Sequence, residues 1–159
     1  MKSLRRYHQS GTHYFITAVT FNRRPILLDV PPFFPDSWGE RQPLAWILIP
    51  DHIHAILDIG DSDRSVIMHK FKITYSRRYR DKFGPGRVWQ NRFWDHSIRD
   101  QSDFNRHLDY IHYNSVKHGL AHDPFEYPHS SLKEYLARGM YERNWGVVEP
   151  PEFLGEFGE

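Results

Sequence analysis

Residues 44–59 have the sequence LAWILIPDHIHAILDI, and this stretch decides the fold. Two apolar runs flank the dipeptide Pro50-Asp51, which is typical of a turn. Such runs on both sides of a turn predict a β-hairpin. On its second strand, His52 and His54 point to the same face, because side chains alternate along a strand. The stretch therefore predicts an antiparallel pair that carries two converging imidazoles.

The segments on either side of this hairpin predict an α+β domain. Residues 13–21 (HYFITAVTF) favour a strand, whereas 31–43, with four prolines, favour a loop. Apolar and aromatic residues recur every four positions from 67 to 83, which predicts a helix that Asp61, Ser62 or Asp63 caps. Further predictions are a bent strand within 87–99, a helix from Ser102 or Asp103 to Gly119, and a short helix near 131–138. An antiparallel sheet with helices packed on one face is the simplest arrangement of these elements.

Length and composition exclude several classes of protein. The chain has 159 residues, which suits one domain, and 16% of them are aromatic, which argues against long disorder. It has no Cys, so a disulfide framework, a thiolate zinc site and a cysteine nucleophile are excluded. No apolar run approaches ~18 residues, and no signal peptide is recognisable, so we expect a cytoplasmic protein without membrane contact.

Charge is unevenly distributed along the chain. Residues 70–92 hold eight Lys and Arg against one Asp, whereas 139–159 hold five Glu against one Arg. We therefore expect a folded domain over 1–138 and an unanchored acidic tail over 139–159. The alternative is a tail that covers the basic surface and restrains activity. Aromatic residues interleave with the basic stretch, an arrangement that suits single-stranded nucleic acid, because cations follow phosphates and rings stack on bases. A solvated helix face whose aromatic residues belong to the core would give the same pattern.

The helix predicted around residues 103–118 contains a second group of polar residues. Its core stripe is Phe104, Leu108, Ile111 and Ser115. Tyr110 and Asn114 lie one turn apart on a flank of that stripe, with Lys117 nearby, whereas Tyr113 faces away from the core. Two interpretations of Tyr110 follow from this geometry: a side chain that leans into a cleft, or a boundary aromatic whose hydroxyl is in water. The His-x-His pair also has two interpretations: it binds a divalent metal, or it is two hydrogen-bonded histidines at a sheet end.

Taken together, IPDHIHAIL and DYIHYNSVKHGL, about 50 residues apart, resemble motifs of the single-tyrosine HUH transposases. Within that superfamily the chain looks most like the REP-associated tyrosine transposases, relatives of the IS200/IS605 transposases. The resemblance spans most of residues 5–125. It implies a ferredoxin-like or RNA-recognition-like sheet, and cleavage and rejoining of single-stranded DNA through a 5′-phosphotyrosine, at hairpin-forming repeats.

Carried onto this chain, the resemblance implies that Tyr110 is the nucleophile and that His52, His54 and Asn114 hold Mg²⁺ or Mn²⁺. The partner is then single-stranded DNA, hairpin-flanked, and the protein acts as a monomer or homodimer. The basic stretch becomes the expected DNA surface, made of Lys70, Lys72, Arg77, Arg78, Arg80, Lys82, Arg87, Trp89 and Arg92, with Lys117 added from the second helix.

The sequence also departs from the family pattern. Residues 25–43 form a shortened connection where relatives carry a full helix between the first two strands, and Ser115 stands where proline is common. The first alternative function is a catalytically inactive nucleic-acid-binding module of the same fold. A metal-dependent phosphoesterase for small substrates is disfavoured, because the two-histidine enzymes need two His-x-Ser/Thr motifs, and His52-Ile53-His54-Ala55 is not one.

Overall fold

The computed structural model describes residues 12–159, so residues 5–11 of the resemblance lie outside it. In this part of the chain four antiparallel strands form one sheet in the order β2-β3-β1-β4. The strands are β1 (His13–Val19), β2 (Ala45–Leu48), β3 (His52–Asp58) and β4 (Trp94–Ser97). The helices are α1 (Phe33–Trp38), α2 (Arg64–Phe83), α3 (Gln101–Lys117) and α4 (Leu132–Ala137), and three short 3₁₀ helices lie at Phe21–Arg23, Leu27–Asp29 and Pro124–Glu126.

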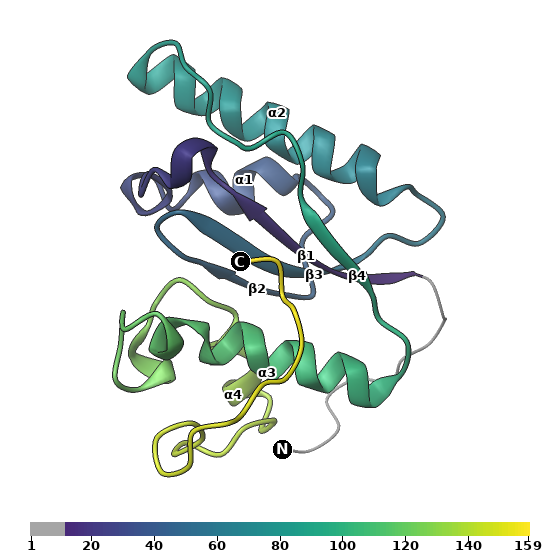
Figure 1. Ribbon diagram of the computed structural model, residues 1–159, viewed down its shortest axis with the longest axis vertical. Coiled ribbons are helices and arrows are strands. Elements are labelled where there is room, and N and C mark those ends of the chain that lie inside the picture. Colours follow the sequence, from purple (N-terminus) through teal and green to yellow (C-terminus); the bar gives the residue numbers. More distant parts are fainter. Residues whose placement is uncertain (1–11) are drawn as a thin grey trace.

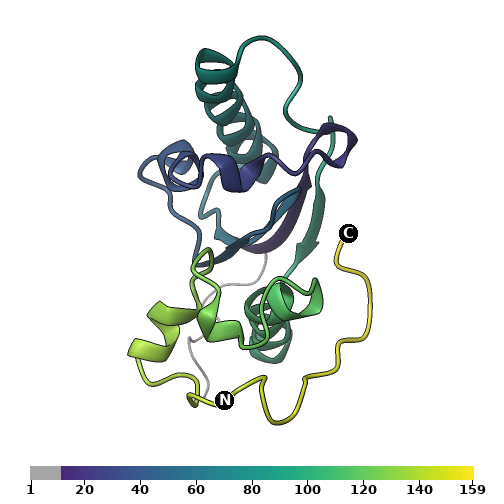
Figure 2. The same cartoon turned by 90° about the vertical axis from the view of Figure 1, so that its left-hand side faces the viewer.

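The predicted α+β class is confirmed, but the placement of helices on one face is wrong. Helices α1 and α2 cover one face of the sheet, and α3 and α4 cover the other (Figures 1 and 2). Strand β3 explains the difference, because every residue from His52 to Leu57 is buried, on both faces. Ile53, Ala55 and Leu57 pack toward α1 and α2, whereas Ile56 packs toward α3.

The connection between the first two strands contains a helix that the sequence analysis missed. Helix α1 packs Trp38 flat against Phe71 of α2, with ring centroids 4.0 Å apart. The prolines do not prevent it, because Pro32 is the N-cap and Pro35 lies in the first turn, where backbone N–H groups have no helical partner. Gly39 ends the helix with a φ of 63°.

The two long helices form largely as predicted. Asp63 caps α2 by accepting hydrogen bonds from the backbone N–H groups of Ser65 and Val66, and Gly84 follows its last residue. Helix α3 begins earlier than predicted, because Asp100 is the cap and Asp103 turns inward. No helix within residues 12–159 is long and apolar enough to cross a bilayer.

The predicted strand at 87–99 is much shorter in the structure. Only Trp94–Ser97 pairs continuously with β1, and a single bridge joins Trp89 to Thr20. Lys72 explains part of this, because its ammonium group binds the carbonyl oxygens of Gln90 and Arg92 at 2.9 and 3.0 Å. A side chain from α2 thus takes the place of a neighbouring strand.

The acidic tail is anchored, contrary to expectation. After α4 the chain runs without regular structure past α3 and back to the sheet, where residue 159 lies near β1 and β3 (Figure 1). Tyr141 and Phe157 are buried in the same hydrophobic cluster as Phe15 and Ile111. The tail therefore packs against the face of the sheet that also carries the two histidines. The proposed boundary at residue 138 stays a prediction.

Candidate active site

The two histidines of β3 present the same ring nitrogen to one point. The Nδ1 atom of His52 lies 2.7 Å from Asp51 Oδ1, and that of His54 lies 2.7 Å from the Thr17 hydroxyl. Thr17 is the residue opposite His54 in the β1–β3 register. Because both Nδ1 atoms are occupied by neighbours, each ring is oriented with Nε2 toward α3. His52 Nε2 is buried and has no hydrogen-bond partner among residues 12–159.

Helix α3 supplies the opposite wall of the site. Tyr110 and Asn114 are both buried, and the Tyr110 ring centroid lies 5.3 Å from that of His54. The Tyr110 hydroxyl receives a hydrogen bond from Lys117 Nζ at 3.0 Å. Of the two interpretations of this tyrosine, the structure therefore supports the cleft. Tyr113, expected to face solvent, is half-buried beside Trp145 of the tail.

Glu159 occupies the centre of this group of side chains. Its Oε1 atom accepts hydrogen bonds from the Tyr110 hydroxyl and from Asn114 Nδ2, and it lies 2.7 Å from His54 Nε2. The Oε2 atom lies 2.6 Å from Lys117 Nζ and 3.2 Å from His118 Nε2. His52 Nε2 also lies 3.8 Å from Oε1, so a single carboxylate contacts six side chains, all from β3 or the C-terminal end of α3.

Burial and this carboxylate set the protonation of the site. Burial lowers the pKa of His54 to about 4 and lowers that of His52. Burial also raises the pKa of Tyr110, and hydrogen bonding to the Glu159 carboxylate raises it further. For Glu159 burial acts in the same upward direction, but hydrogen bonds from His118, His54, Lys117 and Tyr110 hold its pKa well below the ordinary value. At neutral pH the site therefore combines neutral imidazoles with a neutral phenol.

The donor atoms of this site suit a divalent metal ion. His52, His54 and Glu159 each bring one ligand atom, and these atoms lie within 4.8 Å of one another. Two of the buried side-chain atoms that lack hydrogen-bond partners within the described residues lie in this site, the Nε2 of His52 and the Oδ1 of Asn114. Both are acceptors that a cation would satisfy, and the assignment of the Asn114 oxygen follows from its amide nitrogen bonding Glu159.

Comparison with known proteins bears directly on this arrangement. Residues 42–114 match the family described as "Transposase IS200 like". A REP-associated tyrosine transposase of Escherichia coli K12 is 33% identical, and the alignment covers 91% of both chains. The chain belongs to the REP-associated tyrosine transposases.

Two further similarities extend over the whole transposase chain. A relative from Haemophilus influenzae, described as a putative REP-associated tyrosine transposase, is 30% identical over 92% of this chain and 94% of its own. A solved REP-associated tyrosine transposase bound to a REP hairpin is 30% identical, with a TM-score of 0.80 over 100% of this chain and 98% of that one. Sequence and fold agree along the full length.

The residues of the expected DNA surface of this transposase lie in two places, on and beyond α2 and beside the candidate active site. Lys70, Arg77, Arg78, Arg80 and Lys82 are exposed on α2, and Arg87 and Arg92 are exposed beyond it. Helix α2 lies across the sheet from α3, the helix that carries Tyr110 (Figure 1). Lys117 alone of the predicted set contacts the candidate active site.

Trp89 is wrongly predicted as part of the DNA surface, and Lys72, another predicted member, also has a structural role. Trp89 is 5% exposed, and its ring packs against Tyr75 and Phe71, so it belongs to the core under α2. The interpretation that aromatic residues in this stretch are core is thus correct for these three. Lys72 is half-buried and ties α2 to residues 90–92, as described above.

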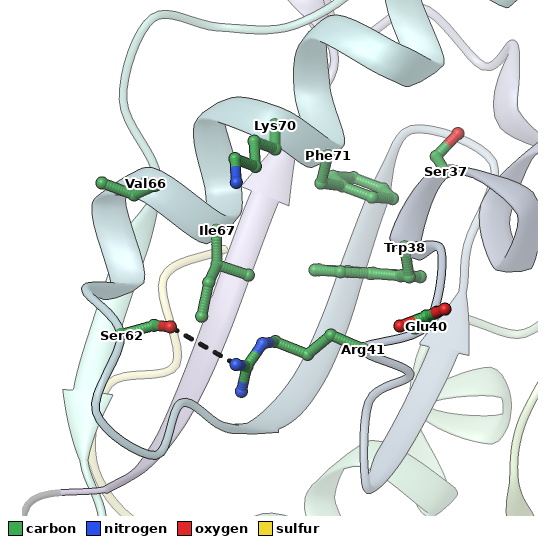
Figure 3. A pocket seen from close by; sticks show the side chains of 9 residues that line it. All are labelled: Ser37, Trp38, Glu40, Arg41, Ser62, Val66, Ile67, Lys70 and Phe71. Atoms are coloured by element: carbon green, nitrogen blue, oxygen red, sulfur yellow. Dashed lines mark hydrogen bonds between the residues drawn. The ribbon is translucent and has the colours of Figure 1, made fainter.

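A separate pocket of about 340 Å³ lies where α1 meets α2 (Figure 3). Lys70 of α2 and Arg41 reach into it beside the stacked rings of Trp38 and Phe71. Arg41 is partly engaged, because it donates to the Asp58 carbonyl and to the Ser62 hydroxyl. This pocket lies on the α1 and α2 face, away from the histidines.

Sequence reasoning missed four residues of the site. Asp51 was assigned only to a turn, although its position directly before His52 could have suggested an orienting carboxylate. Thr17 and His118 gave no distinctive signal, because their proximity depends on strand register and on the end of α3. Glu159 lies 105 positions from His54, and the sequence pattern assigned it only to an acidic tail.

Proposed function

We propose that this transposase cleaves and rejoins single-stranded DNA at hairpin-forming REP-type repeats, with Tyr110 as the nucleophile and Mg²⁺ or Mn²⁺ as the metal. The observation that carries the proposal is the convergence of His52, His54, Tyr110 and Asn114 on one buried point, from two elements about 50 residues apart in the chain. The relative solved with a REP hairpin supports this choice of substrate. We propose that the protein acts as a monomer or homodimer.

In the proposed reaction Tyr110 passes its phenolic proton to water, and its oxygen attacks the scissile phosphorus. A tyrosine–phosphate bond forms, the bond from phosphorus to the 3′-oxygen breaks, and that oxygen leaves as a 3′-hydroxyl after taking a proton from water. Reversal by a second 3′-hydroxyl rejoins the strand. His52, His54 and Asn114 would hold the metal, which would polarise the phosphate and neutralise developing charge when bound.

Lys117 is proposed to assist this attack. A neutral tyrosine is a poor nucleophile at pH 7, since its ordinary pKa is ~10. The ammonium group of Lys117 lies 3.0 Å from the Tyr110 oxygen, and a nearby cation stabilises a phenolate. The Glu159 carboxylate opposes this effect, so the proposed reaction requires that the tail leave the site and that phosphate oxygens replace it.

The proposal is tested with a labelled single strand that carries a REP-type hairpin, incubated with Mn²⁺ and separated on a denaturing gel. We expect the full-length protein, and its Glu159→Gln variant more strongly, to form a covalent protein–DNA adduct. Tyr110→Phe should form none, because no phenolic oxygen remains. Tyr113→Phe, three residues further along α3, is the matched control. An adduct that persists in Tyr110→Phe would contradict the assignment.

A binding module without catalysis is the second candidate, and the observation in its favour is the carboxylate that fills the site. It predicts that the hairpin binds to the full-length protein and to Glu159→Gln, with no adduct in either. Metal-dependent hydrolysis without any covalent adduct would instead indicate a phosphoesterase.

A further inference from the structure

The side chain of Phe157 lies in a slot directly beside the proposed nucleophile. Its ring is parallel to that of Tyr110, with an interplanar angle of 7° and centroids 3.7 Å apart. Phe15 of β1 and His107 of α3 present their rings to it at steeper angles, with centroids 5.9 and 5.4 Å away. The guanidinium of Arg106 lies over the ring, 5.3 Å from its centre. The slot therefore offers one flat aromatic face, two ring contacts and one cation.

Such a slot suits a nucleobase. Single-stranded DNA is held by stacking of its bases on aromatic side chains, and a guanidinium above the ring adds a cation–π contact. All the fixed residues of the slot, Phe15, Arg106, His107 and Tyr110, belong to β1 or α3, whereas Phe157 belongs to the tail. The slot is thus built mainly by β1 and α3, although Phe153 of the tail also contacts the rings of Tyr110 and Phe157, and the Leu154 carbonyl oxygen accepts a hydrogen bond from Arg106.

The spacing between Phe157 and Glu159 fits one nucleotide. Two residues of extended chain span at most roughly 7 Å, and here they join a flat ring in the slot to a carboxylate at the metal-ligand group. A nucleotide likewise joins a flat base to an anionic phosphate across a short sugar. The tail backbone between them is fixed by the Thr17 hydroxyl, which donates to the Phe157 carbonyl oxygen at 2.5 Å.

A groove continues beyond the tail in the same direction. Next to Gly158 lies a cavity of about 220 Å³ whose lining includes Arg92, Phe93 and Trp94. Gly158 has a φ of 77°, and a Cβ atom there would clash with the Trp94 side chain, so the tail backbone presses closely on that indole. The cation and two aromatic rings beside Gly158 would suit the phosphate and base of a further nucleotide.

We propose that the slot filled by Phe157 is the binding site for the nucleobase adjoining the scissile phosphate, and that Phe157 and Glu159 stand in for the base and the phosphate of that nucleotide. The inference rests on the proposed function, because it places the phosphate beside Tyr110. It adds that Arg106 is a positioning residue for the base.

The test uses the full-length Phe157→Ala variant, in which the slot is open, and single strands that carry an abasic residue on one or the other side of the cleavage point. On one side, removal of the base should raise KM for adduct formation roughly tenfold or more, as expected from loss of one base–aromatic stack. The intact strand should also bind Phe157→Ala more tightly than the wild-type protein. Equal KM values for intact and abasic strands, with cleavage preserved, would overturn the inference and leave the proposed function standing.

Arg106→Gln in the Phe157→Ala background separates recognition of the base from a general loss of affinity. This change should raise KM for the intact strand and leave KM for the abasic strand unchanged. Arg99→Gln is the matched control, because Arg99 shares the Asp103 carboxylate with Arg106 but is not in contact with Phe157. Equal effects of Arg106→Gln on both strands would show a charge effect only and overturn the assignment.

A metal-free binding measurement keeps the inference testable without catalysis. A strand with 2-aminopurine at the same position should lose fluorescence on binding to Phe157→Ala, because the base stacks on Tyr110. Unquenched fluorescence in a bound strand overturns the slot assignment. Quenching here, together with no adduct in the assay with Mn²⁺, would support the slot and count against the proposed chemistry alone.

Discussion

Helices α2 and α3 lie on opposite faces of the same sheet and bury different kinds of residue. Helix α2 has 20 residues, and among its buried residues only Ser76 and the Tyr75 hydroxyl are polar. Helix α3 has 17 residues and buries six with polar side chains besides its apolar stripe. These six are Asp103, His107, Tyr110, His112, Asn114 and Ser115.

Buried polar groups are unfavourable unless neighbours satisfy them. On α3, Asp103 is held by nearby His96 and Arg99, and the Ser115 hydroxyl has no hydrogen-bond partner among the described residues, but other partners are distant in sequence. His112, for example, lies 2.9 Å from the Tyr141 hydroxyl and 2.8 Å from the Ser131 hydroxyl. The α2 face thus mainly supplies hydrophobic stability, whereas the α3 face maintains a polar arrangement. Four predictions test this division, in order of decreasing effect.

The largest expected effect is on the α2 face. Phe71 is 1% exposed and contacts the rings of Trp38, Phe34 and Trp89. Phe71→Ala should lower the free energy of unfolding by about 3–5 kcal/mol, because it removes buried contacts and leaves a cavity. Urea unfolding measures this loss. Ile73→Ala, at an exposed position of the same helix, should change stability by under about 0.5 kcal/mol. A loss below about 1 kcal/mol for Phe71→Ala would contradict the division.

The second prediction concerns the buried carboxylate of α3. Burial would raise the pKa of Asp103, but hydrogen bonds from His96 and Arg99 hold it well below its ordinary 3.8. Because the pKa is lowered on folding, the stabilisation is present above pH 3.8 and is lost as the pH falls further. Asp103→Asn should therefore cost on the order of 2–3 kcal/mol at pH 7 and progressively less below pH 3.8.

Urea unfolding at pH 7, 4 and 2.5 measures this difference between Asp103→Asn and the wild type. Burial lowers the pKa of His107 to about 4, although the Asp103 carboxylate 3.3 Å away raises it. The wild type should therefore lose stability between pH 6.5 and 4, and Asp103→Asn should lose more in this range, because the negative charge beside His107 is absent. Asp81→Asn removes an exposed carboxylate from α2 and should have little effect at any pH. If Asp103→Asn lowers the free energy of unfolding by the same amount down to pH 2.5, the stabilisation does not come from the lowered pKa of Asp103.

The third prediction tests the orientation of the histidines. Asp51→Asn removes the carboxylate that holds His52 Nδ1, so we expect Mn²⁺ to bind 10- to 100-fold more weakly by calorimetric titration. Unfolding free energy should change little, since Asp51 is only partly buried. Asp58→Asn, at the other end of β3, is the control. Equal Mn²⁺ affinities for Asp51→Asn and wild type would show that His52 needs no orienting carboxylate.

The smallest expected effect concerns a single cation of α2. If Arg77 contacts one phosphate, Arg77→Gln should weaken binding of the hairpin-flanked strand modestly and reduce the slope of log K against log salt by about 0.7. Fluorescence anisotropy over a salt series measures this slope. Lys133→Gln, exposed on α4, is the control. Identical slopes for Arg77→Gln and the wild type would remove Arg77 from the DNA surface.

The sequence predicted the elements whose formation depends on residues close together in the chain. The hairpin at residues 44–59 and helix α2 follow from apolar periodicity and from turn and capping residues, and both form as expected. Helix α1 was missed because proline content was weighed without the position of each proline in the first turn. The buried state of Trp89 depends on tertiary packing against α2, which the alternation of basic and aromatic residues does not indicate.

The site was predicted to the extent that spacing defines it. His-x-His on a strand and Tyr-x-x-x-Asn on a helix fix which side chains share a face, and the structure brings these four together. Thr17 was out of reach because it depends on the register between β1 and β3. Glu159 was out of reach because an irregular segment has no periodicity from which its end point could be calculated.

The distance along the chain between two buried aromatic residues of the tail, Tyr141 and Phe157, has a consequence for tolerance of insertions. The fifteen residues between them make no helix or strand, and Val147, Val148 and Leu154 among them are exposed. Because loop closure entropy changes slowly with length, the exposed stretch around Val147 and Val148 can gain or lose residues at little cost. Trp145 and Phe153 in the same span pack against the core cluster, and the Leu154 carbonyl oxygen accepts a hydrogen bond from Arg106. The last three positions have no such freedom, since Phe157, Gly158 and Glu159 each fit a different neighbour. The tail therefore combines an exposed irregular stretch that tolerates changes in length with a three-residue segment, 157–159, that does not.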